Sequence, residues 1–244
     1  MPLFAQITDS HLRADEPERV LKLRAGVDRI LGLGVAPDAV LVTGDIADDG
    51  GSSEYEDAAR ELARLDVPLV VLPGNHDDRA GMRAAFGLPG TGEERLQSVS
   101  VHGGVRVVAC DTLVPGSDDG DLDVAWVAKR LAEDRLTPTV VAMHHPPYLV
   151  GIEQMDGMAP PADQRAELAR VLEAAPNVIR VVAGHLHLTT AASVGGVVAV
   201  TAPSVNIQLA PDYGTGLVAI TDAQAGVMVH AVTGDGIASH VIPV

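Results

Sequence analysis

Short apolar runs that each end in a polar cluster constrain the fold of this 244-residue chain more than any other feature. Continuous Val, Leu and Ile runs of this length are typical of strands buried on both faces. Segments with helical periodicity separate several of them, which predicts an α/β fold. The apolar runs occupy residues 3–7, 39–42, 69–72, 105–110, 140–143 and 178–183, and the predicted helices 17–33, 53–65, 121–136 and 163–174.

The pattern changes from about residue 188 onward, where short β-type runs are separated by glycine pairs. The runs at 197–201, 216–221 and 227–232 predict hairpins. Parallel crossovers followed by hairpins indicate mixed sheets. No Ser/Gly-rich or charge-rich linker divides the chain, so we expect residues 1–244 to form a single domain.

Composition excludes several classes of function. The 33 acidic and 17 basic residues give a net charge of −16, which disfavours binding of a nucleic-acid polymer through its phosphates. The lone Cys110 permits neither an intrachain disulfide nor a thiolate zinc site. We see no signal-peptide pattern and no apolar stretch long enough to span a bilayer, so we expect a cytoplasmic protein.

Polar clusters follow five of the predicted strands directly. Because ligand sites in open α/β sheets form at the carboxyl ends of strands, these clusters should meet. Each alone has an ordinary explanation, such as an N-cap, a turn or a hydrogen-bonded histidine, but five together do not. The clusters are Asp9-Ser10-His11, Gly44-Asp45-Ile46-Ala47-Asp48, Gly74-Asn75-His76-Asp77, His144-His145 and Gly184-His185-Leu186-His187.

The residue types in these clusters are those of a metal site. Imidazole and carboxylate donors without thiolate favour zinc, iron, manganese or cobalt. The donors are numerous enough for two ions, an arrangement suited to phosphoryl chemistry. The candidate ligands are Asp9, His11, Asp45, Asn75, His144, His185 and His187.

The ordered set Asp-x-His, Gly-Asp-x-x-Asp, Gly-Asn-His-Asp, His and Gly-His-x-His, from Asp9 to His187, resembles the signature of the calcineurin-like metallophosphoesterases. Within that family the chain is most similar to class III cyclic nucleotide phosphodiesterases and bacterial glycerophosphodiesterases. Residues 203–208, Pro-Ser-Val-Asn-Ile-Gln, also resemble a stretch of that subgroup. The resemblance implies two packed mixed β-sheets flanked by helices, a four-layer sandwich with the site at its top edge.

The resemblance also implies residue roles. A hydroxide between two divalent or trivalent metal ions would attack phosphorus, and the product alcohol would leave from the opposite side. Asp9, His11 and His187 would hold the first ion, Asn75, His144 and His185 the second, with Asp45 bridging.

Other residues would act around the ions. With Asn75, His76 would contact the phosphate, or it would protonate the leaving alkoxide. Asp77 would orient His76, and Asp48 would support the loop that carries Asp45. The structural roles go to His145, His102, His230 and His240.

The expected function is hydrolysis of a small phosphodiester, either a 3′,5′-cyclic nucleotide or a glycerophosphodiester. A phosphomonoesterase is the second hypothesis, but it needs cationic groups and only Arg13 and Arg79 adjoin the motifs. A non-catalytic scaffold should have lost ligands, and none is missing. Two questions stay open: whether copies of the chain assemble, and whether residues 148–162 form a lid, an interface or a plain loop.

Overall fold

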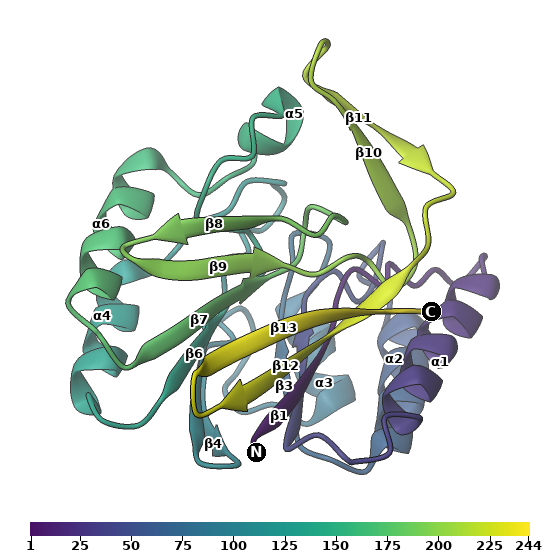
Figure 1. Ribbon diagram of the computed structural model, residues 1–244. Helices are drawn as coiled ribbons and strands as arrows, with labels where there is room; N and C mark the ends of the chain where they lie inside the picture. Colours follow the sequence, from purple (N-terminus) through teal and green to yellow (C-terminus); the bar gives the residue numbers. More distant parts are fainter.

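The computed structural model describes residues 1–244 and contains two large β-sheets with helices outside them (Figure 1). The helices are α1 (Glu18–Leu31), α2 (Ser52–Leu62) with the 3-10 turn η1 (Ala63–Leu65), α3 (Arg79–Phe86), α4 (Val124–Glu133), α5 (Glu153–Asp156) and α6 (Ala162–Glu173). The strands are β1 (Leu3–Ile7), β2 (Ala39–Thr43), β3 (Leu69–Leu72), β4 (Ser98–His102), β5 (Val105–Ala109), β6 (Thr139–Ala142), β7 (Val178–Ala183), β8 (Ala191–Val194), β9 (Val197–Thr201), β10 (Gln208–Asp212), β11 (Leu217–Thr221), β12 (Gly226–Thr233) and β13 (Gly236–Pro243).

Both large sheets are mixed, as the sequence predicted. The first has the order β13-β12-β1-β2-β3, with β1, β2 and β3 parallel and β12 antiparallel to β1. The second has the order β4-β5-β6-β7-β9-β8, with parallel strands in the middle and antiparallel β4 and β8 at its edges. The end of the chain thus completes the sheet that its start begins.

The two sheets pack face to face and bury both faces of their central strands. In β1, Phe4 lies in the core between the sheets, whereas Ala5 and Ile7 lie in the core under the first set of helices. A third core joins the second sheet to α4 and α6. Figure 1 shows α1 and α2 on one flank and α4 and α6 on the other. The four-layer sandwich expected from the sequence is therefore confirmed.

Two helix starts differ from the prediction. The N-cap of α4 is Asp123, whose side chain accepts a hydrogen bond from the Trp126 amide at 2.9 Å. Asp121, where the sequence predicted this helix to begin, instead pairs with Arg95 and accepts from Gln164. The N-cap position of α6 is Pro161, so Asp163 lies inside the first turn. An acidic residue there interacts favourably with the helix dipole but does not cap the helix.

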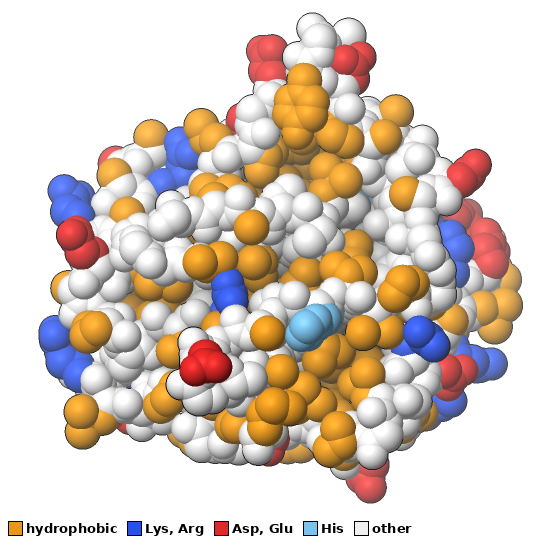
Figure 2. All heavy atoms as spheres, viewed as in Figure 1, with side chains coloured by type: hydrophobic (Ala, Val, Ile, Leu, Met, Phe, Trp, Pro, Cys, Tyr) orange, Lys and Arg blue, Asp and Glu red, His pale blue; other side chains and the backbone are white.

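The C-terminal hairpins form as predicted, but one of them stands apart. Strands β10 and β11 make a separate two-stranded sheet. It projects from the body beside α5 in Figure 1, and Figure 2 shows hydrophobic side chains gathered at its base. Helix α5 docks on this hairpin, since the Gln154 amide donates to Gly216 O at 2.9 Å and the Val218 amide donates to Gln154 Oε1 at 3.0 Å.

None of the helices combines the length and the apolar character that a bilayer crossing requires.

The cap assignment predicts unequal costs for two similar substitutions. Asp123→Ala removes the acceptor of the Trp126 amide and should lower the free energy of unfolding by about 1 kcal/mol. The control, Asp163→Ala, removes no cap and should change it by less than about 0.5 kcal/mol. Urea denaturation of both variants measures the difference. An equal or larger loss in Asp163→Ala would contradict the assignment.

Candidate metal centre

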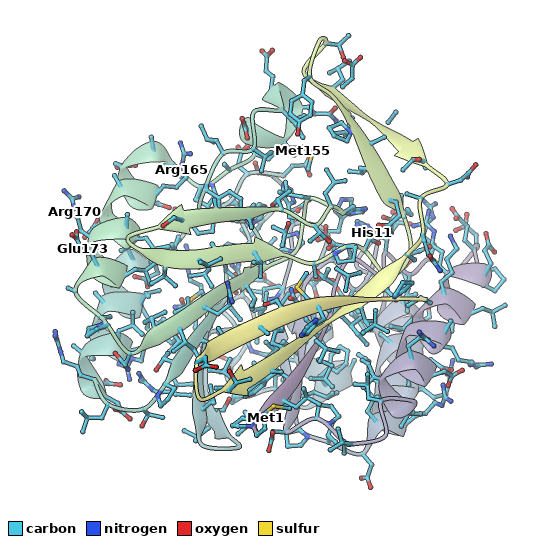
Figure 3. The ribbon with its side chains drawn as sticks, viewed as in Figure 1. Met1, His11, Met155, Arg165, Arg170 and Glu173 are labelled. Atoms are coloured by element: carbon cyan, nitrogen blue, oxygen red, sulfur yellow. The ribbon has the colours of Figure 1, made fainter.

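The structure brings all seven candidate ligands together at one edge of the sandwich. They come from the loops that follow five strands: Asp9 and His11 after β1, Asp45 after β2, Asn75 after β3, His144 after β6, and His185 and His187 after β7. All the carboxylates and imidazoles of this set are buried. The edge forms one side of a cleft, in which His11 and Met155, both labelled in Figure 3, lie on opposing segments.

The backbone is unusual at these positions. Six non-glycine residues have a positive φ, and five of them are candidate ligands: Asp9 (55°), His11 (41°), Asp45 (49°), His185 (69°) and His187 (52°). This left-handed region is sparsely populated by residues with a Cβ atom and persists only where the surroundings enforce it. The strained conformations therefore coincide with the candidate site.

Close approach between loops explains two of the glycines in the motifs. A Cβ atom on Gly74 would lie 2.1 Å from Asp45 Oδ1, and one on Gly184 would lie 2.1 Å from Thr8 Oγ1. Backbone amides also hold the carboxylates, because the His76 amide donates to Asp45 Oδ1 at 3.0 Å and the His185 amide donates to Asp9 Oδ1 at 3.1 Å. The last of these bonds links the two sheets.

The first half of the site contains Asp9, His11, Asp45 and His187. The Nε2 atoms of His11 and His187 lie 3.0 Å apart, and they lie 3.5 Å from Asp45 Oδ2 and 3.4 Å from Asp9 Oδ1 respectively. The other ring nitrogens are hydrogen-bonded, since His11 Nδ1 donates to Asp48 Oδ1 at 2.8 Å and His187 Nδ1 donates to Ile207 O at 2.7 Å. With these tautomers, two imidazole lone pairs and two carboxylates face one small volume.

The second half contains Asn75, His144 and His185, again with Asp45. His144 Nε2 lies 3.3 Å from Asp45 Oδ2 and 3.2 Å from Asn75 Oδ1, while His144 Nδ1 donates to Thr43 O at 2.8 Å. His185 Nδ1 lies 3.1 Å from Asn75 Oδ1, and its Nε2 is buried without any hydrogen-bond partner. Because the proton of a neutral His144 lies on Nδ1, its Nε2 is an acceptor that faces the acceptor oxygens of Asp45 and Asn75.

The charges show what such an arrangement requires. Although burial lowers the pKa of His144, the charge of Asp45 and a hydrogen bond to it prevail and raise that pKa to about 9. Burial acts to raise the pKa of Asp45, yet His144 holds it well below its usual value. The site thus stabilises positive charge among buried carboxylates. Converging nitrogen and oxygen donors without thiolate fit metal ions such as zinc, iron, manganese or cobalt.

Supporting contacts come from two further segments. Asp48 contacts the site more directly than the sequence suggested, because its carboxylate accepts from His11 and its carbonyl accepts from His76 Nδ1 at 2.9 Å. Residues 203–208 lie under the first half of the site, where Ser204 Oγ donates to Asp9 O at 2.7 Å and Asn206 Nδ2 donates to Ser10 O at 2.8 Å.

The predicted role of Asp77 as the partner of His76 has to be corrected. Its buried carboxylate accepts hydrogen bonds from the amides of Ile46 and Ala47 at 3.1 Å, from the Gly74 amide at 2.9 Å and from Tyr55 Oη at 3.2 Å. Burial and the charge of Asp45 raise its pKa to about 7. Asp77 therefore ties together the loops after β2 and β3, and it does not contact His76.

Of the histidines expected to be structural, His145 lies at the site itself, with a ring nitrogen within 4.8 Å of ring nitrogens of His144 and His185. His145 lies beside His185, with ring centroids 4.5 Å apart, but both of its ring nitrogens are used: Nδ1 bonds to Thr112 Oγ1 at 2.8 Å and Nε2 donates to Asp118 O at 3.1 Å. His102 ends β4 just before the Gly103-Gly104 turn, and His230 is buried in β12.

The cleft has a volume of about 220 Å³, and its far wall was only partly predicted. Met155 and Met158 line it, so segment 148–162 is more than a plain surface loop. Gln154, in the same segment, also lines the cleft. No local sequence signal points to the remaining lining residues, because they approach the site only through the folding of the β5–α4 loop and of the β10–β11 hairpin. They are Asp118, Leu209 and Val218.

Neither candidate arginine reaches the cleft. Arg79 is buried in a pair with Asp111 at 2.7 Å. Arg13 pairs with Asp15 at 3.0 Å and with Asp48 at 3.2 Å. The residues that line the cleft include no lysine or arginine.

The contacts of Asp77 and His76 predict different effects on stability. Asp77→Ala leaves three buried amides and the Tyr55 hydroxyl without their acceptor, so it should lower the free energy of unfolding by about 3 kcal/mol. The side chain of His76 is 37% exposed, so His76→Ala should change the free energy of unfolding by less than about 0.5 kcal/mol. Urea denaturation in the presence of chelator measures both. Equal losses would contradict the corrected role.

Comparisons with known proteins agree with this geometry. The profile of the family described as "Calcineurin-like phosphoesterase" matches residues 2–188. The chain is 33% identical over 201 residues to the glycerophosphodiester phosphodiesterase GpdQ of Enterobacter lignolyticus, covering 77% of this chain and 72% of that one. It is 32% identical to a cAMP/cGMP dual specificity phosphodiesterase of Mycobacterium tuberculosis, covering 80% of this chain and 64% of that relative.

A further relative is the 3′,5′-cyclic adenosine monophosphate phosphodiesterase CpdA of Pseudomonas aeruginosa, 30% identical over 86% of this chain and 78% of that one. Among solved structures, a dimetal phosphatase from Danio rerio superposes with a TM-score of 0.72 at 15% identity, over 99% of this chain and 98% of that one. The structural likeness supports the fold.

Proposed function

This chain belongs to the calcineurin-like phosphoesterase family of metal-dependent hydrolases, and on this basis we propose that it is a dinuclear-metal phosphodiesterase. Its substrates are small phosphodiesters, of the cyclic nucleotide or glycerophosphodiester class that the relatives' names give. Residues 1–244 act as one domain in this proposal, because β12 and β13 complete the sheet that begins with β1.

Two groups of donors would hold the ions. Asp9, His11 and His187 bind one, Asn75, His144 and His185 bind the other, and Asp45 lies between them, within 3.5 Å of both His11 and His144. When bound, such ions supply Lewis-acid charge to phosphoryl oxygens and lower the pKa of water enough to give a nucleophile near neutral pH. Hydrogen bonds on the far ring nitrogens of His11, His144 and His187 keep these three imidazoles oriented for this task.

His76 is proposed as the group that acts on the substrate. It lines the cleft, and because Nδ1 donates to Asp48 O, Nε2 is the nitrogen left to face the substrate and carries a proton for the leaving alcohol only when the ring is protonated. Although burial lowers its pKa, the charge of Asp45 and the hydrogen bond to Asp48 raise it overall. The imidazole therefore stays protonated to a higher pH than a free one, as a general acid requires.

The residues that line the cleft are the observation that supports a diester rather than a monoester as substrate. A phosphomonoester is doubly charged above about pH 6 and calls for more positive charge than a diester does. The lining residues include no lysine or arginine, and both nearby arginines are paired with carboxylates. This observation favours the phosphodiesterase over the phosphomonoesterase.

The function predicts a metal-dependent preference between two chromogenic substrates with the same leaving group. Protein stripped with chelator and reconstituted with Mn²⁺ should hydrolyse bis(p-nitrophenyl) phosphate with a higher kcat/KM than p-nitrophenyl phosphate. Chelator should abolish both activities. Asn75→Ala removes a ligand and should lower kcat/KM for the diester at least about a hundredfold.

Higher kcat/KM on the monoester would move the assignment to a phosphomonoesterase. No Mn²⁺-dependent turnover of either substrate would contradict the proposal, provided that circular dichroism shows the protein to be folded.

A further inference from the structure

We propose that Asp118 makes this site selective against doubly charged phosphoryl groups, an inference that rests on the proposed phosphodiesterase function. Asp118 lies in the loop between β5 and α4 and lines the cleft together with Asn75, His76 and His185. Neither the strand-end motifs nor any helix pattern points to it. Its carboxylate is a fixed negative charge on the substrate side of the candidate ligands.

The carboxylate contacts a candidate ligand from that side. Asn75 Nδ2 donates to Asp118 Oδ1 at 3.4 Å, while Asn75 Oδ1 faces His144 Nε2 at 3.2 Å and His185 Nδ1 at 3.1 Å. Because a carboxylate accepts only, this contact turns the amide nitrogen toward the cleft and the amide oxygen toward the histidines. Asp118 therefore stands next to the position that a phosphoryl group must occupy to meet Asn75.

The loop that carries Asp118 is fixed from two directions. The Asp118 carbonyl accepts from His145 Nε2 at 3.1 Å, and the Gly120 amide donates to Met158 O at 2.9 Å. Gly120 packs so closely on His145 that a Cβ atom there would lie 2.7 Å from the ring. The position of the carboxylate is thus a built feature of the cleft.

No cation neutralises this carboxylate. No lysine, arginine or histidine nitrogen lies within 4.0 Å of the Asp118 carboxylate oxygens, whereas Arg13, Arg79 and Arg95 are each paired with other acidic residues. A diester brings one negative charge to this carboxylate and a monoester dianion brings two. The carboxylate repels the additional charge, and the lining of the cleft has no lysine or arginine to offset that repulsion.

The test compares the ratio of kcat/KM for p-nitrophenyl phosphate to that for bis(p-nitrophenyl) phosphate, with the Mn²⁺-loaded enzyme at pH 8. Asp118→Asn keeps the shape and an acceptor for Asn75 but removes the charge, so the ratio should rise about tenfold. Raising the ionic strength should raise this ratio for the wild-type enzyme, because salt screens the exposed charge of Asp118. The ratio for Asp118→Asn should not change.

A neighbouring residue supplies the matched control. Asp119 is exposed and accepts from Ser117 Oγ at 2.9 Å, but it does not line the cleft. Asp119→Asn makes the same change in net charge, and its ratio should stay at the wild-type value. An equal rise in both variants would assign the effect to overall charge and overturn the proposal.

Calorimetry gives a readout that does not depend on turnover. Inorganic phosphate, a dianion at pH 8, should bind Mn²⁺-loaded Asp118→Asn about tenfold more tightly than the wild-type enzyme. Unchanged phosphate affinity and an unchanged ratio would overturn the proposal. Equal decreases in kcat/KM for both substrates, together with weaker Mn²⁺ binding, would also overturn it, because Asp118 would then act only by positioning Asn75. Failure of the proposed function is distinct, since the wild-type enzyme itself would lack Mn²⁺-dependent turnover.

Discussion

The buried carboxylate of Asp45 is the interaction on which the rest of the site depends. It lies within 3.5 Å of His11 and His144, and it accepts from the His76 amide. A buried carboxylate is costly unless positive charge faces it. As neutral rings, with their other nitrogens donating to Asp48 and to Thr43 O, its histidine neighbours bring no positive charge to it. The charge comes from protonation of a ring, which the pKa of about 9 for His144 reflects, or from bound cations. The two halves of the site therefore share one requirement for positive charge, with Asp45 between them.

The packed sheets of the sandwich stabilise strained backbone conformations at the site. Five candidate ligands have left-handed backbones, at a cost of about 1–2 kcal/mol each. The loops that hold them follow strands with fully buried residues on both faces, and hydrogen bonds such as that from the His185 amide to Asp9 join the two sheets. Packing on both sides of each sheet keeps the loops that carry the candidate ligands in place. This is the preorganisation that a hydrolytic metal centre needs.

The strands and the meeting of the seven candidate ligands at one edge were predictable, because their signals are local. A buried strand followed by Asp or His is visible in a few consecutive residues, and parallel strands bring such ends together whatever the loops do. The partner of Asp77 was not predictable, because the loop after β3 turns its side chain away from His76 and toward the loop after β2. Asp118, Leu209 and Val218 reach the cleft only through tertiary folding of the loop and the hairpin that carry them. The start of α4 was also not predictable, because Asp121 pairs with Arg95 and Asp123 caps the helix.

Anomalous scattering from a crystal of this chain soaked in Mn²⁺ tests the central claim most directly. The account predicts two peaks on opposite sides of Asp45, one beside Asp9, His11 and His187 and the other beside Asn75, His144 and His185. Asp45→Ala should weaken both peaks, because both halves of the site use that carboxylate. A single peak, or peaks that lie away from Asp45, would contradict the dinuclear arrangement.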